Sequence, residues 1–196
     1  MDPIKIKVIV GSTREGRVSD RPARWIAEEA KKMEGVDVEI LDLRDYPLPF
    51  FNEAQSPSMI TEPYANPAVQ KWTQKIAEGD AFIIVTPEYN HGYPAVLKNA
   101  IDYVNKEWNR KPVGFISHGS AMGSRAVEQL RQVAVELQMA PIRHAIQMSW
   151  DQRMAFAQAP MPVPAEVFAP LAGAKDAFLD QLMWWAKALK AARQTT

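Results

Sequence analysis

The stretch that decides the fold is AFIIVTPEYNHGYPAVLKNAIDYV, residues 81–104. It begins with a continuous apolar run, residues 81–86, typical of a strand buried on both faces of a parallel sheet. Pro94 then stands where a helix readily begins. The apolar residues that follow have the spacing of one helix face: Leu97, Ala100, Ile101 and Val104. The stretch therefore predicts a strand, a polar loop and a helix over residues 94–108.

The same alternation extends along the rest of the chain. Four more segments, rich in β-branched and other apolar residues, are predicted to be strands: residues 4–10, 36–43, 112–117 and 141–149. Helical periodicity separates or follows them, at residues 23–33, 67–77, 127–137 and 178–189. This alternation predicts an α/β fold: a doubly wound five-stranded parallel sheet, flavodoxin-like with strand order 2-1-3-4-5, or its Rossmann relative.

Two long stretches carry no regular pattern, residues 44–66 and 151–170, and the second is rich in proline. Structureless segments of this length inside a compact domain are usually functional loops or interface arms. Plain surface loops are an equal alternative. Residues 171–193 are predicted to form a C-terminal helix, and the whole chain, 1–196, a single domain.

The composition disfavours several classes of protein. Lysine plus arginine and aspartate plus glutamate both total 23, and the zero net charge argues against general binding to nucleic acid or to a membrane surface. The absence of cysteine excludes disulfides, thiolate nucleophiles and iron–sulfur clusters. The three histidines lack the spacing of metal ligands, so no metal site is predicted. The N-terminal residues show neither a signal peptide nor a membrane span, and the expected location is cytoplasmic.

In doubly wound sheets, ligands bind beyond the carboxyl ends of the strands. After the first predicted strand, Ser12 and Ser19 offer hydroxyl groups, and Arg14 and Arg17 offer guanidinium forks that suit phosphate oxygens. The helix that follows adds the free N–H groups of its first turn. These features predict a phosphate site, with a merely charged loop as the alternative. Neither the Walker pattern nor the dinucleotide glycine pattern fits this loop.

The third and fourth strands also end in polar loops. Pro87 fixes the direction in which the chain leaves the third strand. Backbone amides and side chains of residues 88–92 can line a flat ring system, although such a loop, taken alone, is as often ordinary surface. The fourth strand is followed by two serines and two glycines. These are Ser117, Gly119, Ser120 and Gly123, where glycine permits close backbone approach to a ligand. Closely placed His118 and Ser120 suggest a hydrolase, but the G-x-S-x-G nucleophile pattern is absent.

Three segments together resemble the NADPH-dependent FMN reductase family of flavodoxin-like proteins. They are GSTREGR, TPEYN with PAVLKNAIDY behind it, and GFISHGSAMGSRAVEQLR, and the resemblance covers roughly residues 4–150. It implies that Ser12, Arg14, Arg17 and Ser19 bind the FMN phosphate. It implies that Pro87, Glu88, Tyr89 and Asn90 lie along the isoalloxazine and ribityl portions, and that Ser117, Gly119, Ser120 and Gly123 face the pyrimidine side. The chain departs from the family at His118, where relatives often have an aromatic residue.

The resemblance also implies an activity. NADPH or NADH gives a hydride to FMN, and two electrons then pass to a small-molecule acceptor such as a flavin, a quinone or an azo compound. No side chain is obliged to act as acid or base, so no catalytic residue is assigned. The alternative is an FMN-binding electron carrier or redox sensor without nicotinamide turnover. The family is commonly homodimeric or homotetrameric, and residues 151–170 and 94–108 are the expected interface elements.

Overall fold

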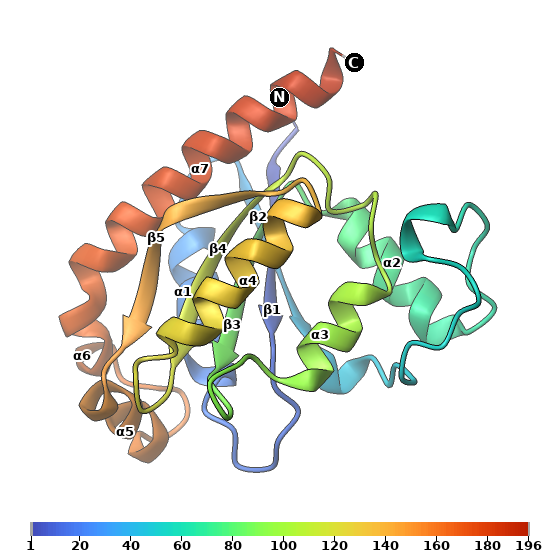
Figure 1. Cartoon of the computed structure of the whole chain (residues 1–196). Coiled ribbons are helices and arrows are strands. Elements are labelled where there is room, and N and C mark those ends of the chain that lie inside the picture. The colour runs from blue at the N-terminus through green and yellow to red at the C-terminus, as the bar shows by residue number, and fades with distance from the viewer. Residues whose placement is uncertain (1, 196) are drawn as a thin grey trace.

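A computed structural model describes residues 2–195 of the chain. Its core is one sheet of five parallel strands in the order β2-β1-β3-β4-β5, which confirms the predicted flavodoxin-like fold (Figure 1). The strands are β1 (Ile4–Val10), β2 (Val36–Asp42), β3 (Ala81–Pro87), β4 (Pro112–His118) and β5 (Ala140–Met148). β3 and β4 are buried along their whole length, as continuous apolar runs require.

Helices cover both faces of the sheet. They are α1 (Asp20–Lys31), α2 (Pro67–Glu78), α3 (Ala95–Asp102), α4 (Ser124–Glu136), α5 (Trp150–Gln158), α6 (Ala165–Phe168) and α7 (Ala172–Gln194). Short 3-10 turns are η1 (Leu43–Asp45), η2 (Pro57–Met59) and η3 (Ala169–Leu171). α7 confirms the predicted C-terminal helix, and α2 confirms the predicted helix over residues 67–77.

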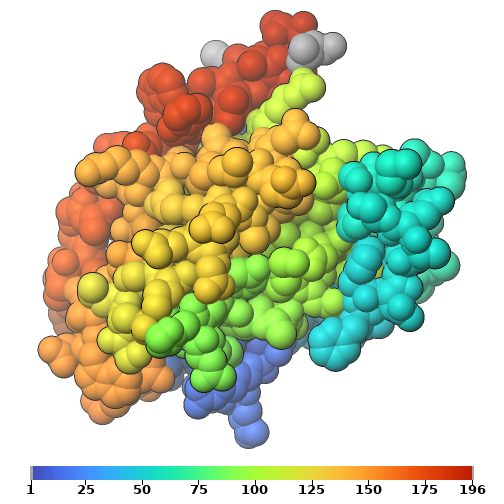
Figure 2. All heavy atoms as spheres, viewed as in Figure 1, coloured from blue at the N-terminus to red at the C-terminus, as the bar shows by residue number. Residues whose placement is uncertain are grey.

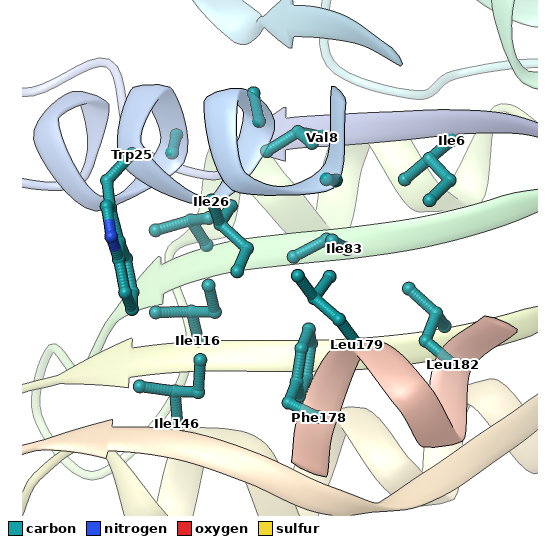
Figure 3. Close-up of a cluster of buried hydrophobic side chains, with 14 of the residues drawn as sticks. Ile6, Val8, Trp25, Ile26, Ile83, Ile116, Ile146, Phe178, Leu179 and Leu182 are labelled. Carbon is teal, nitrogen blue, oxygen red and sulfur yellow. The ribbon is translucent and has the colours of Figure 1, made fainter. Parts of the chain in front are cut away.

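The apolar side chains form one cluster on each face of the sheet. Ile26 of α1 and Phe178 of α7 pack against Ile83 and Ile116 of the strands, as Figure 3 shows. The opposite cluster joins α2, α3 and α4 to the other face and contains the fully buried Trp72. Each large apolar side chain buried in this way stabilises the fold by about 1.5–3 kcal/mol. The two clusters fix the sheet rigidly between its helices, and with it the loops at the strand ends.

The helix predicted over residues 94–108 is shorter than expected, because α3 ends at Asp102. Val104 and Trp108 are nevertheless buried. They belong to turns, in which the N–H of Val104 bonds to Ile101 O and that of Trp108 to Asn105 O. The apolar period therefore continued past the helix end because the following turns pack on the same core.

The stretch 151–170, predicted to be irregular, contains most of α5 together with α6 and η3. α5 buries only Phe156, so its sequence has almost no amphipathic period to detect. A capping box at Ser149 and Gln152 holds its first turn. By contrast, residues 44–66 have no regular structure beyond 3-10 turns, as predicted, and they run along the edge of the molecule beside α2 and α3 (Figures 1 and 2). Within residues 2–195, no helix is long and apolar enough to cross a membrane.

Candidate functional site

The loops that follow β1, β3 and β4 meet α5 at the carboxyl edge of the sheet (Figure 1). They enclose a cavity of about 160 Å³ that opens to solvent. It is lined by Arg14, Gly16, Arg17, Val18, Pro87, Glu88, Tyr89, His118, Gly119, Ser120, Trp150 and Arg153. Seven predicted site residues are thus brought together, while Ser12, Ser19, Asn90, Ser117 and Gly123 lie around or behind the cavity wall.

The loop between β1 and α1 has the chemistry of an anion site. Within the described chain, the N–H groups of Thr13, Glu15, Gly16 and Val18 have no hydrogen-bond partner. The exposed guanidinium of Arg14 is likewise free of protein partners among residues 2–195. These donors lie just ahead of α1, whose N-terminal end carries a partial positive charge. A phosphate group matches such a set of donors.

The sequence suggested that the guanidinium fork of Arg17 is free for phosphate oxygens, but the fork is paired within the protein. Its guanidinium forms a two-pronged ion pair with Asp42 at the end of β2, in which Nη1 lies 2.7 Å from Oδ1. Nη1 also donates to Ser12 O at 2.6 Å. Burial raises the pKa of Asp42, but hydrogen bonds from Arg17 and from the N–H of Arg44 outweigh it and leave the pKa lowered. Arg17 therefore fixes the shape of the loop, and Asp42 already occupies its fork.

Ser12 and Tyr89 connect the loop after β1 to the loop after β3. The Ser12 Oγ and Tyr89 Oη atoms lie 2.9 Å apart in a hydrogen bond. One hydroxyl donates to the other, so one hydroxyl hydrogen remains for a ligand. The bond holds the two loops at a fixed separation.

Glu88 and Arg125 connect the loop after β3 to the first turn of α4, which follows the loop after β4. The Glu88 carboxylate, whose side chain is only 3% exposed, accepts from Arg125 Nε at 2.7 Å and from the N–H of Arg125 at 3.2 Å. Arg125 Nη1 also contacts His91 Nε2 at 2.7 Å. The carboxylate is fully engaged by α4, so Glu88 positions the loop and adds no free negative charge to the cavity.

The loop after β3 makes a two-residue hairpin turn. Tyr89 and Gly92 exchange backbone hydrogen bonds of 2.8 and 3.0 Å, and the two residues between them have positive φ angles, 49° for Asn90 and 69° for His91. Non-glycine residues rarely adopt this region, and such strain concentrates at functional sites. The turn leaves the Asn90 side chain exposed.

The two glycines of the loop after β4 allow close contact with neighbouring residues of the protein. A Cβ at Gly119 would lie 2.9 Å from Glu88 Cβ, and one at Gly123 would lie 2.6 Å from Ser117 Cβ. Gly123 also has a positive φ of 77°. The Ser117 hydroxyl donates to Met122 O at 2.8 Å, which ties the loop to its own backbone. Ser120 remains exposed in the cavity wall.

His118, for which the sequence predicted no role, lines the cavity and is buried. Its Nε2 lies 2.9 Å from Ser19 Oγ in a hydrogen bond, so the Ser19 hydroxyl is engaged. Burial, with a smaller contribution from the charge of Arg153, lowers the pKa of His118 to about 4. The imidazole is therefore neutral at pH 7.

Trp150 and Arg153 also line the cavity, and the sequence did not predict either one, because Arg153 lies in the stretch without periodicity and Trp150 directly precedes it. The Arg153 guanidinium stacks over the Trp150 ring at 5.0 Å from its centroid. The capping box of α5 was the one sequence signal that pointed to a helix here.

The fold is flavodoxin-like, and a loop with unpartnered N–H donors lies at the switch in strand order, where such folds bind mononucleotides. A family model described as NADPH-dependent FMN reductase matches residues 4–152. The chain belongs to this family and is a flavin-dependent NAD(P)H oxidoreductase.

Individual relatives agree with this assignment. The chain is 39% identical over 150 residues to an NAD(P)H-dependent FMN reductase of Schizosaccharomyces pombe, covering 76% of this chain and 75% of the relative. It is 32% identical over 141 residues to an NAD(P)H:quinone oxidoreductase of Solanum tuberosum, covering 69% and 70%. Among solved structures, the flavoenzyme NAD(P)H:(acceptor) oxidoreductase FerB of Paracoccus denitrificans superposes with a TM-score of 0.68 at 25% identity, covering 92% of this chain and 97% of FerB.

Proposed function

We propose that the cavity at the carboxyl edge of the sheet holds FMN, with the phosphate at the loop between β1 and α1. The observation that carries the proposal is the set of donors without partners in that loop. They are the N–H groups of Gly16 and Val18 and the guanidinium of Arg14. Phosphate is the part of FMN that such donors fit. The ring portion extends along the loops after β3 and β4, where Asn90 and Ser120 keep free side chains.

The protein groups in the site bind and orient the cofactor. Bound FMN supplies the hydride and electron transfer between NAD(P)H and an acceptor. Ion-paired Glu88 and Arg125 hold the two ring loops together, and the Ser12–Tyr89 bond holds the phosphate loop to them. His118 is neutral at pH 7, so it brings no charge to the site. No side chain of the cavity is proposed as an acid or a base.

The proposed electron acceptor is a small oxidised molecule, a flavin, a quinone or an azo compound. The names of relatives support this range, since they include FMN reductases, a quinone oxidoreductase and an azoreductase. Either NADPH or NADH is the proposed donor.

We also propose a homodimer or homotetramer with a cytoplasmic location. Large apolar side chains are exposed in the stretches 44–66 and 151–170, with Phe50 at 83% and Met161 at 50% exposure. Exposed apolar groups of this size are typical of protein interfaces. Size-exclusion chromatography with light scattering tests the assembly, and a monomer at all concentrations would contradict it.

The visible absorption spectrum of the purified protein tests the function. The spectrum is recorded before and after addition of FMN, and again after anaerobic addition of NADPH. A bound flavin spectrum that bleaches with NADPH is the expected result. Bound flavin that neither NADPH nor NADH bleaches would favour an electron carrier, and no flavin binding at all would contradict the proposed site.

A further inference from the structure

We propose that Arg153 of α5 supplies the second cation for the phosphate of the bound mononucleotide, in the role that the sequence analysis predicted for Arg17. This inference rests on the proposed function and assigns a binding role to a residue outside the three strand-end loops.

Arg17 already has its counter-charge. Its side chain is 7% exposed and is held by Asp42 and by Ser12 O. Moving it to a phosphate would leave the Asp42 carboxylate, 22% exposed, without its partner. Breaking such a pair is strongly unfavourable. Arg17 therefore stays with Asp42 when a ligand binds.

Two cations that line the cavity are left without a counter-charge. Arg17 is offset by Asp42, and Glu88 is offset by Arg125. His118 is neutral at pH 7. The uncompensated charges that line the cavity are then two guanidiniums, those of Arg14 and Arg153, and no ion pair within residues 2–195 engages either one. A phosphate monoester carries about −1.5 to −2 charges at pH 7, which two cations match.

The cavity is too small to enclose a whole mononucleotide. Its volume of about 160 Å³ is smaller than the roughly 300–1,000 Å³ of typical small-molecule sites, so it encloses only part of a mononucleotide. The loop residues Gly16 and Val18, with free N–H groups, line the same cavity as Arg153. The enclosed part therefore includes the phosphate end, and Arg14 and Arg153 both line the cavity that would hold it.

α5 is attached to the first turn of α1, which directly follows the phosphate loop. Arg21, in the first turn of α1, donates through Nη1 to Phe156 O and, at 2.6 Å, to Ala159 O. The capping box at Ser149 holds the other end of α5. Arg153 also stacks over Trp150, which limits the rotamers of a long side chain. The guanidinium is thus pre-positioned at the cavity, and little ordering is needed on binding.

The test compares FMN with riboflavin, which has the same ring and ribityl chain but no phosphate. Dissociation constants for both are measured by quenching of flavin fluorescence with the apo-protein. The variants are Arg153→Gln, Arg153→Lys and the matched control Arg24→Gln. Arg24 is exposed on α1 and does not line the cavity. Its replacement by Gln removes the same charge as Arg153→Gln.

Arg153→Gln is expected to weaken FMN binding about 10-fold or more, as for a lost hydrogen bond to a charged group, and to leave riboflavin binding unchanged. Arg153→Lys retains part of the FMN preference, and Arg24→Gln leaves both constants unchanged. Unfolding midpoints of the apo-proteins show whether each variant is folded, and a folded Arg153→Lys keeps the test valid if the glutamine variant is not.

Three results would overturn the inference while leaving the proposed function intact. They are an unchanged FMN constant in a folded Arg153→Gln variant, an equal loss for FMN and riboflavin, and a loss seen only in the Michaelis constant for NADPH or for an anionic quinone. The last would assign Arg153 to the second substrate. If the unmodified protein binds neither flavin, the proposed function itself fails.

Discussion

The two ends of the sheet treat positive charge in opposite ways. Towards the amino ends of the strands, every buried cation has a partner. Lys7 of β1 contacts Glu39 and donates to Glu78 Oε2 at 2.7 Å. Lys111, just before β4, donates to the carbonyls of Ile76 and Ala77 at the end of α2, at 3.1 and 3.0 Å. These cations are used within the fold.

At the carboxyl ends, Arg14 and Arg153 line a cavity and lack ion-pair partners in the described residues. Arg17 and Arg125 are exceptions at this end, since Arg17 pairs with Asp42 and Arg125 with Glu88. The comparison teaches that a cation already paired is part of the structure, whereas a cation left unpaired beside a cavity is available to a ligand. Variants of the paired cations should therefore lower stability, whereas variants of the unpaired cations should weaken ligand binding.

The largest expected effect is that of Arg17→Ala, which tests the more deeply buried of these two paired arginines. Removal of one partner of a mostly buried pair is expected to lower the free energy of unfolding by about 3 kcal/mol, because Asp42 is left without its fork. Urea denaturation measures this change. The double variant Arg17→Met with Asp42→Leu, in which both charges are absent, should recover part of the loss. A stable Arg17→Ala variant with weakened FMN binding would return Arg17 to the ligand.

His118 gives an effect of similar size that depends on pH. Its pKa of about 4 lies below the ordinary value of 6.5, so the unfolded chain binds the proton more tightly than the native state. The contribution to stability is present above pH 6.5 and is lost as the pH falls from about 6.5 to about 4. The loss is about 3 kcal/mol at 1.36 kcal/mol per pKa unit.

Urea denaturation at a series of pH values measures this loss. His118→Gln does not titrate and can keep a hydrogen bond to Ser19, so its stability should fall less steeply over the same range. Carboxylates such as Glu78, whose pKa is lowered by the hydrogen bond from Lys7, lose stability at lower pH in both proteins and cancel in the comparison. Identical pH profiles would contradict the neutral, buried state of His118.

Arg14→Ala should affect binding alone. Loss of its charged hydrogen bonds to the phosphate is expected to weaken FMN binding by ~1.5–3 kcal/mol, while the stability of the apo-protein stays unchanged, since Arg14 has no side-chain partner in residues 2–195. Fluorescence titration measures the first and urea denaturation the second. Unchanged FMN affinity would show that the loop has another purpose.

The fold and part of the site could be predicted from the sequence, but the pairing of the arginines could not. The fold was predictable because residues 81–86 and their counterparts are apolar enough to define strands, and helical periods separate them. The donors of the loop between β1 and α1 were predictable from residue type. The pairing of Arg17 was not, because Asp42 is brought beside it only when β2 joins the edge of β1. Arg153 was missed because α5 buries a single side chain and has no apolar period.

At the opposite end, Lys7→Met is expected to lower the free energy of unfolding by about 1 kcal/mol. The effect is modest because Glu39 and Glu78 are each about two-fifths exposed and retain Lys75 as a partner. FMN affinity should equal that of the unmodified protein, which makes this variant the control for Arg14→Ala. A weaker FMN complex would show that charge at this distance influences the site and would weaken the division between the two ends.

The smallest expected effect is a change in the pKa of His118 in the Arg153→Gln variant. Burial is the main cause of the lowered pKa, and the positive charge of Arg153 is the second cause. Removal of that charge should therefore raise the pKa slightly and leave it below the ordinary value for histidine. NMR titration of the imidazole resonances measures it, and the chain has only three histidines to assign.

Arg24→Gln is the control for this titration and should not move the His118 resonance. FMN added to the unmodified protein should also raise the pKa, because a phosphate held by Arg153 offsets the same charge that Arg153→Gln removes. Riboflavin, without the phosphate, should produce no electrostatic change of this kind. If Arg153→Gln leaves the pKa of His118 unmoved, the guanidinium does not act on the cavity, and the carboxyl end holds one available cation instead of two.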